Sequence, residues 1–291
     1  MSPAIFVLCL EKLNQMITFK VESGDWKGIQ LDPMGPTLSH LCFADNMVLF
    51  TEATTAQVAI IQDCLDRFCE ALGQRISYSK SHVFFSKNTP PGLADDIANQ
   101  LSIARTGDMG KYLGVLSIHG RVTRGTFKDL LDRVNGRLEG WKAKLLSLAG
   151  RVTLARSVLN AIPIYTMQTV VLPKGICHEI EKRTRRFIWE TDGQGTNKLS
   201  LVNWETVTSP KKYGGLGVRR LQEVNKACMA KLGWRLKQEE GSLWAQTMLS
   251  KYAQVDHGNQ SRASNAWKGI VAATPIVDQG LMKLVRNGKN T

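Results

Sequence analysis

Residues 38–50, LSHLCFADNMVLF, constrain the fold more than any other part of the chain. Apolar residues stand on both sides of a short tip, Ala44-Asp45-Asn46, and this pattern predicts two buried strands joined by a tight turn with Asp45 at its apex. An unpaired carboxylate in apolar surroundings is unfavourable, and its usual partner is a metal ion. The alternative is that Asp45 and Asn46 are ordinary turn residues, because both types are common in turns.

The segments up to about residue 120 predict an α+β fold, with a small antiparallel sheet backed by helices. Helices are indicated by apolar residues at three- and four-residue steps, and strands by short β-prone runs. The predicted elements are a helix over 5–17, the hairpin, a helix between Thr54 and Gly73, a strand at the end of 76–86, a helix over 93–101 and a strand over 112–118.

The pattern changes at Thr123 to long, basic helices. Apolar stripes predict helices over 127–138, 145–159 and 176–189. Residues 1–104 contain 7 Lys and Arg against 11 Asp and Glu, whereas residues 105–291 contain 31 against 14. Clustered cations attract phosphates and release counterions, so the second region is a candidate polyanion-binding surface. The alternative is a solvated basic face.

Several classes of protein are disfavoured by the remaining features. No apolar run is long enough to span a bilayer, and the first residues lack the basic start and cleavage site of a secretory signal. The six cysteines lack zinc-site spacing, so we expect reduced thiols without a disulfide partner in an intracellular protein, nuclear or cytoplasmic. Residues 213–217, YGGLG, lack the strand–turn–helix setting of a dinucleotide loop and are interpreted as a glycine turn.

Over most of its length the chain resembles the reverse transcriptase region of plant LINE-type (non-LTR) retrotransposons. The segments that carry the resemblance are SPAIFVLCLEKLNQMI, LSHLCFADNMVLF, LGQRISYSKSHVFFS, KYLGVLSIHGRVTRGTF, GWKAKLLSLAGRVTLARSVLNAIPIYTMQTVVLP, IEKRTRRFIW, GGLGVRRL and KLGWRLKQEEGSLWAQTMLSKY. The resemblance implies the C-terminal part of a polymerase palm over 1–120, a helical thumb-like region over 121–195, and a helical connection region over 196–291 that leads toward a further domain.

In that family a Phe/Tyr-Ala-Asp-Asp turn joins an earlier aspartate in holding two Mg²⁺ ions, for which carboxylate oxygens are preferred ligands. Phe43, Ala44 and Asp45 match the turn, but Asn46 stands where the family has aspartate. Loss of one charge at about 4 Å corresponds to roughly 4 kcal/mol at an effective dielectric near 20, or about a thousandfold in rate if the transition state feels it fully.

The earlier aspartate would lie before Met1, so the resemblance implies a reverse transcriptase remnant without polymerase activity. Asp45 would hold a metal only if another carboxylate were supplied, and no cofactor is expected here. The resemblance places Lys80 in the segment that follows the active-site hairpin, where a lysine can act as an acid near the pyrophosphate. The alternative is an exposed strand-edge lysine. An interrupted palm sheet is also expected to leave apolar surface exposed.

The basic helices are expected to bind RNA, DNA or an RNA–DNA duplex through phosphate contacts that do not read sequence. The residues expected to make these contacts are Lys142, Lys144, Arg151, Arg156, Lys182, Arg183, Arg185 and Arg186. Two further interpretations stay open beside the inactive remnant. One is a non-enzymatic RNA- or DNA-binding protein, and the other is part of a polyprotein with a ribonuclease H domain further downstream.

Overall fold

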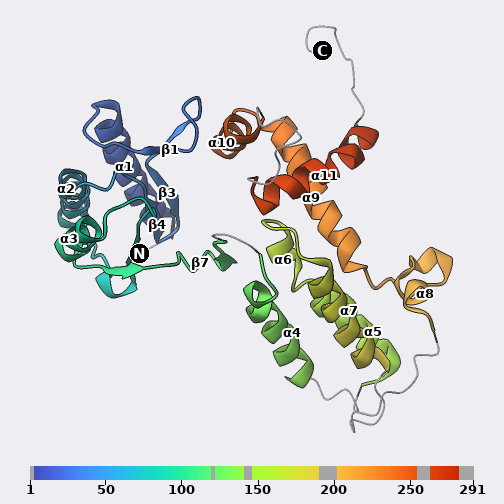
Figure 1. Cartoon of the computed structure of the whole chain (residues 1–291). Coiled ribbons are helices and arrows are strands. Elements are labelled where there is room, and N and C mark those ends of the chain that lie inside the picture. The colour runs from blue at the N-terminus through green and yellow to red at the C-terminus, as the bar shows by residue number, and fades with distance from the viewer. Residues whose placement is uncertain (1–2, 119–121, 141–145, 190–201, 254–262, 282–291) are drawn as a thin grey trace. The chain divides into compact units, whose positions relative to one another are not determined.

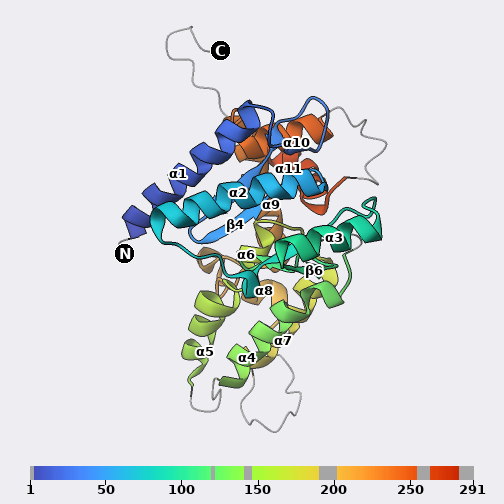
Figure 2. The same ribbon diagram turned by 90° about the vertical axis from the view of Figure 1, so that its left-hand side faces the viewer.

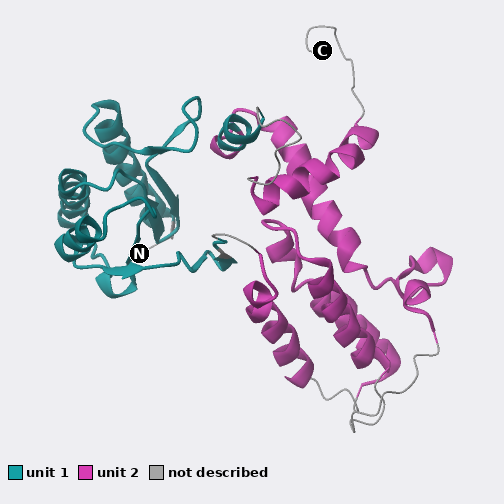
Figure 3. Ribbon diagram, viewed as in Figure 1, with its two compact units in different colours: residues 1–119, 246–254 teal, residues 120–245, 255–291 magenta. Residues whose placement is uncertain are grey.

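The computed structural model describes residues 3–118, 122–140, 146–189, 202–253 and 263–281, and shows an α+β protein (Figure 1). The chain forms two compact units (Figure 3). The first contains residues 1–119 and 246–254, and the second contains residues 120–245 and 255–291. The division into palm, thumb-like and connection regions, which rests on the resemblance, stays a prediction.

The first unit combines helices with short strands. Its elements are α1 (Pro3–Glu22), β1 (Ile29–Gln30), β2 (Thr37–Leu38), β3 (His40–Phe43), β4 (Asn46–Leu49), α2 (Thr55–Leu72), the 3-10 turn η1 (Tyr78–Lys80), β5 (His82–Phe84), α3 (Pro91–Leu101), β6 (Ala104–Thr106), β7 (Lys111–Tyr112) and β8 (Val115–Leu116). The pairs β1–β2, β3–β4 and β7–β8 are antiparallel, and β5–β6 is parallel because α3 carries the chain back between them.

The core of the first unit lies where α1 and α2 run side by side against the hairpin β3–β4 (Figure 2). Thr54 caps α2 by accepting a hydrogen bond from the backbone N–H of Gln57, and Gly73 ends it with a φ of 64°. The predicted helix between Thr54 and Gly73 is therefore confirmed. The buried core residues are Leu13, Ile17, Trp26, Ile61, Cys64 and Phe68.

The predicted strand over 112–118 is wrong. Leu113 and Gly114 have φ angles of 50° and 77°. Positive φ at both central positions is the geometry of a tight two-residue hairpin turn, so the apolar run doubles back as β7 and β8. The strand β6 was not predicted, because residues 104–106 are too polar to suggest a strand without knowledge of their pairing with β5.

The second unit is helical. Its elements are η2 (Gly125–Phe127), α4 (Lys128–Gly140), α5 (Leu148–Leu154), the π-helical turn η4 (Ala155–Leu159), α6 (Ile164–Met167), α7 (Lys174–Trp189), α8 (Trp204–Thr208), the 3-10 turn η5 (Lys211–Tyr213), α9 (Leu221–Gln238), α10 (Leu243–Tyr252) and α11 (Asn265–Gly280), with part of α10 belonging to the first unit.

The helix α7 lies at the centre of the second unit, where it packs against α4, α5 and α9, while α9 also packs along α11. Ile180 and Ile188 of α7 are almost fully buried. The predicted helices over 127–138 and 176–189 are confirmed by α4 and α7. The helix predicted over 145–159 is shorter in the described part of the chain and changes from α to π geometry at Ala155.

Two further findings concern the apolar character of the helices and the state of the cysteines. Among the described residues, no helix has both the length and the apolar character needed to cross a membrane. The six cysteines are all free thiols.

Candidate functional site

The predicted hairpin is confirmed. In β3 and β4, His40 lies opposite Leu49 and Phe43 lies opposite Asn46. The turn consists of Ala44 and Asp45, and Ala44 has a φ of 50°. Asp45 therefore stands at the apex of a two-residue turn, as the polar tip of the sequence predicted.

The two faces of the hairpin differ, because side chains alternate along a strand. On one face, Met47 and Leu49 pack against the α1–α2 core, and the Cys42 thiol donates a hydrogen bond to Asn14 Oδ1 of α1 at 3.3 Å. On the other face, Leu41 is 39% exposed and Phe43 is 61% exposed. The prediction of two buried strands is therefore wrong for this face, and the expected exposed apolar surface is confirmed.

The physical reason is that β3 and β4 pair only with each other in the described part of the chain. Helices cover one face of this two-stranded sheet, and the described residues leave the other largely open. Asn46, which lies opposite Phe43 in the register, belongs to the open face. The position that the resemblance compares with a metal-binding aspartate thus points away from the helical core.

Asp45 is exposed, and its Oδ1 accepts a hydrogen bond from the Asn46 side chain at 3.3 Å. The described residues contain no group of three or more His, Cys, Asp or Glu side chains placed to hold a metal ion. Two acidic residues that precede Asp45 in the sequence have local partners: Asp25 pairs with Lys20 at 3.1 Å, and Asp32 accepts a hydrogen bond from the backbone N–H of Met34. Two Mg²⁺ ions require several oxygen ligands, so these residues do not fit a two-metal site.

Lys80 is the last residue of η1 and directly precedes Ser81 and β5. Its side chain is exposed, and its backbone N–H donates to the carbonyl of Ser77 at 3.1 Å. No hydrogen bond or ion pair of the described residues joins Lys80 to Asp45. Both roles considered for Lys80, an acid or an exposed strand-edge residue, therefore stay predictions.

An exposed basic stripe runs along α7. It consists of Lys174, His178, Lys182 and Arg186, and we call it the α7 stripe. Residues at four-residue steps share one side of a helix and rise by about 6 Å per step, so the stripe is about 18 Å long. Its Lys and Arg side chains make no ion pair with any described residue. Lys174 and His178 were not predicted as contact residues, although their four-residue spacing was a usable signal.

Arg183 faces the interior instead. Its guanidinium donates to Glu179 Oε1 at 3.0 Å, to the carbonyl of Leu131 at 3.2 Å and to Asn135 Oδ1 at 2.6 Å. The hydrogen bond and the charge of Arg183 hold the pKa of Glu179 below its ordinary value. These contacts fasten α7 to α4, so Arg183 is engaged within the protein rather than displayed to a ligand.

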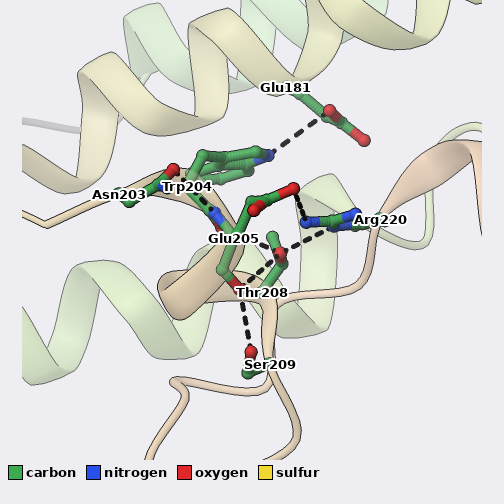
Figure 4. A network of polar contacts seen from close by, with 7 residues as sticks. All are labelled: Glu181, Asn203, Trp204, Glu205, Thr208, Ser209 and Arg220. Carbon is green, nitrogen blue, oxygen red and sulfur yellow. Dashed lines mark hydrogen bonds and ion pairs between the residues drawn. The ribbon is translucent and has the colours of Figure 1, made fainter.

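Arg185 is also engaged, through the segment that contains α8. Its guanidinium carbon lies 5.0 Å from the centre of the Trp204 ring, a cation–π contact. The indole N–H of Trp204 donates to Glu181 at 3.3 Å, and the other Glu181 oxygen accepts from the backbone N–H of Leu221 at 2.7 Å. Glu181 thereby joins α7 to Trp204 of α8 (Figure 4). It also joins α7 to the first residue of α9.

The same network continues along residues 203–220. We call these residues, together with Glu181 and Arg185, the α8 clamp. Asn203 caps α8 by accepting from the backbone N–H of Glu205. Arg220 pairs with Glu205 at 2.9 Å and donates to the Thr208 hydroxyl at 3.1 Å (Figure 4). The clamp therefore links α8 to Arg220, the residue directly before α9.

The remaining predicted contact residues fall into three groups. Arg151 is only 6% exposed and lies within the helical core, so it does not stand on an open surface. Arg156 is exposed in η4. Lys142 and Lys144 lie outside the described residues. Of the cations predicted on α5, η4 and α7, the structure displays Arg156, Lys182 and Arg186, and turns Arg151, Arg183 and Arg185 inward.

Comparisons with known proteins identify plant relatives. The chain is 43% identical over 169 residues to a candidate ribonuclease H protein of Arabidopsis thaliana, At1g65750, an alignment that covers 55% of this chain but only 27% of that protein. It is 27% identical over 136 residues to an uncharacterized mitochondrial protein of the same plant, AtMg00310, and this match covers 45% of the chain and 88% of the relative. No protein-family profile matches the chain.

Proposed function

We propose that this chain is a reverse transcriptase segment of a plant non-LTR retrotransposon, whose retained property is sequence-independent binding of nucleic-acid duplexes. The α7 stripe is the observation that carries the binding. Its Lys and Arg side chains make no ion pair with a described residue, so a phosphate backbone can pair with them without breaking existing ion pairs. The resemblance along the chain and the similarity to a plant protein named for ribonuclease H support the retroelement origin.

The geometry of the stripe suits a duplex rather than a small ligand. Three cations and one imidazole lie in a row about 18 Å long, which spans several phosphates of one strand. They stand on a helix that the contacts of Arg183 hold rigid. Contacts of this kind position a backbone but read no bases, so binding should be insensitive to sequence and should weaken steeply with salt.

Neutralising the stripe tests the proposal. We expect Lys182→Gln with Arg186→Gln to weaken filter binding of an RNA–DNA duplex, and to lower the slope of log affinity against log salt by about 2, or about 1 for each lost phosphate contact. The matched control is Lys226→Gln with Arg235→Gln, which removes the same charge from α9, where both cations already pair with glutamates. Equal losses in the two double variants would contradict a role for the stripe.

We further propose that the hairpin does not support polymerisation in this chain, because Asp45 has an amide neighbour and the described residues contain no group of three or more His, Cys, Asp or Glu side chains placed to hold a metal ion. Primer extension on an RNA template with Mg²⁺ or Mn²⁺ is expected to give no template-directed incorporation. Asn46→Asp alone is expected to leave this result unchanged, since one added carboxylate does not complete the ligands of two ions. Incorporation that Asp45→Ala abolishes would show that the proposal is wrong.

A ribonuclease H activity is the second candidate, suggested by the name of the first relative. That name describes a protein of which the matched segment is 27%. Metal-dependent hydrolysis of a phosphodiester needs clustered carboxylates, and the described residues provide no such cluster. The geometry of the chain therefore favours binding over hydrolysis.

A further inference from the structure

We propose that residues 210–217, the loop PKKYGGLG, form a binding site for single-stranded nucleic acid, in which Tyr213 stacks on a base while Lys211, Lys212 and Arg156 contact phosphates. This site belongs to the second unit and shares no residue with the α7 stripe. It extends the proposed function from duplexes to single strands. From the sequence, residues 213–217 of this loop were predicted only as a glycine turn.

Tyr213 has the exposure expected of a stacking platform. It is 70% exposed, although a tyrosine usually buries much of its ring. The Lys212 ammonium lies 4.7 Å from the ring centre, so a cation already sits against the ring. A base can stack on an exposed ring whatever its identity, because every base has a π face, and a neighbouring lysine can then reach the adjoining phosphate.

Two further cations, Lys211 and Arg156, lie close to Gly217. A Cβ atom built on Gly217 would lie 3.3 Å from Lys211 Cγ and 3.6 Å from Arg156 Nε. Gly217 has a φ of 69°, and its lack of a side chain lets these two residues from η5 and η4 approach each other. Neither makes an ion pair with a described residue. A phosphate close to Gly217 can therefore pair with either side chain without breaking an ion pair.

The loop is held in one conformation before any ligand binds. The backbone N–H of Leu216 donates to the carbonyl of Val207 at 3.0 Å, and that of Gly217 donates to the carbonyl of Ser209 at 3.3 Å. These two bonds close the loop onto the end of α8. A Cβ atom on Gly215 would lie 1.9 Å from the Ser209 carbonyl oxygen, so only glycine permits this closure. The α8 clamp anchors the α8 segment, to which the loop is bonded, to α7. A preorganised loop loses little conformational entropy on binding.

The test uses fluorescence anisotropy with two labelled probes of equal charge. One is an oligothymidylate of about 12 nucleotides, within the span that single-strand sites cover, and the other is an abasic strand of the same length. Tyr213→Ala is expected to weaken oligothymidylate binding about 5- to 150-fold and to leave abasic binding unchanged. Tyr213→Phe is expected to bind both probes like the wild type, because it keeps the ring.

Charge removal should act differently. Lys211→Gln with Arg156→Gln is expected to weaken binding of both probes and to lower the salt slope by about 1.4, or about 0.7 for each contact to a single strand. Wild-type affinity of Tyr213→Ala for oligothymidylate, or equal losses on both probes, would overturn the proposal. A negative result for the proposed duplex binding by the α7 stripe can be told apart from a negative result here. The stripe is tested with duplex probes and the double variant of Lys182 and Arg186, whereas this site is tested with single strands and Tyr213.

Discussion

Replacement of Trp26 by alanine is expected to destabilise the first unit by about 3–5 kcal/mol, the usual loss for removing a buried tryptophan. Trp26 is 2% exposed and belongs to the core that contains Leu13, Ile17 and Phe68. Its indole N–H also donates to the carbonyl of Phe50 at 3.0 Å, directly after β4. The substitution would therefore open a cavity and leave a carbonyl at the base of the Asp45 hairpin without its partner.

Urea unfolding and hydrogen exchange would measure this effect. A loss of about 4 kcal/mol corresponds to a midpoint lower by roughly 2 M urea at a typical dependence of about 2 kcal/mol per molar. Exchange should become faster in peptides of α1, α2 and the hairpin, and stay unchanged in α7 and α9. Trp26→Phe, which keeps a ring but loses the N–H donor, should show a smaller loss of about 1–3 kcal/mol. A wild-type midpoint for Trp26→Ala would contradict this account of the core.

Replacement of Trp204 by alanine is expected to destabilise the second unit by a similar amount, about 3–5 kcal/mol. Trp204 is 9% exposed, and its ring carries two contacts at once: the Arg185 guanidinium lies against its face, and Glu181 accepts from its N–H. Among the described residues, Arg185 Nε is buried without a hydrogen-bond partner, so the ring is its main compensation. Loss of the Trp204 ring would leave the Arg185 guanidinium buried without this contact, and the α8 clamp without its link to Glu181.

Two variants separate these contributions in urea unfolding. Trp204→Phe keeps the cation–π contact and loses the hydrogen bond to a charged acceptor, so we expect a loss of about 1.5–3 kcal/mol. Trp234→Ala makes the same change at a tryptophan of α9 that is 43% exposed, and should cost no more than about 1 kcal/mol. Faster hydrogen exchange in peptides of residues 203–221 should accompany Trp204→Ala alone. If Trp234→Ala lowered the free energy of unfolding as much as Trp204→Ala does, the α8 clamp would have no special role in stability.

Much of the local structure was predictable from the sequence, because it depends on short-range chemistry. The cap at Thr54, the left-handed Gly73 and the polar tip at Asp45 each act within a few residues. The helical stripes of α4 and α7 were visible because an amphipathic helix repeats every three or four residues. These patterns predicted an α+β region followed by a helical, basic region, as the structure shows.

The roles of individual charges were not predictable in the same way. Sequence spacing placed Lys182, Arg183, Arg185 and Arg186 together as one basic cluster. The structure separates them, because Arg183 finds acceptors on α4 and Arg185 finds the ring of Trp204. Those partners lie about 20 to 50 positions away in the sequence, and no local pattern indicates them. An arginine within reach of buried acceptors satisfies them, and only those without such partners stay available to a ligand.

The hairpin shows the same division between local and tertiary information. Its turn and its mismatch at Asn46 can be read from thirteen consecutive residues. Which face is covered depends on where α1 and α2 pack, and whether Asp45 has another carboxylate beside it depends on residues brought near by folding. Hydrophobic periodicity and turn chemistry thus set the elements of this protein. Long-range packing alone decided which of its charged and aromatic side chains are open to a partner, because burial is a property of the assembled surface.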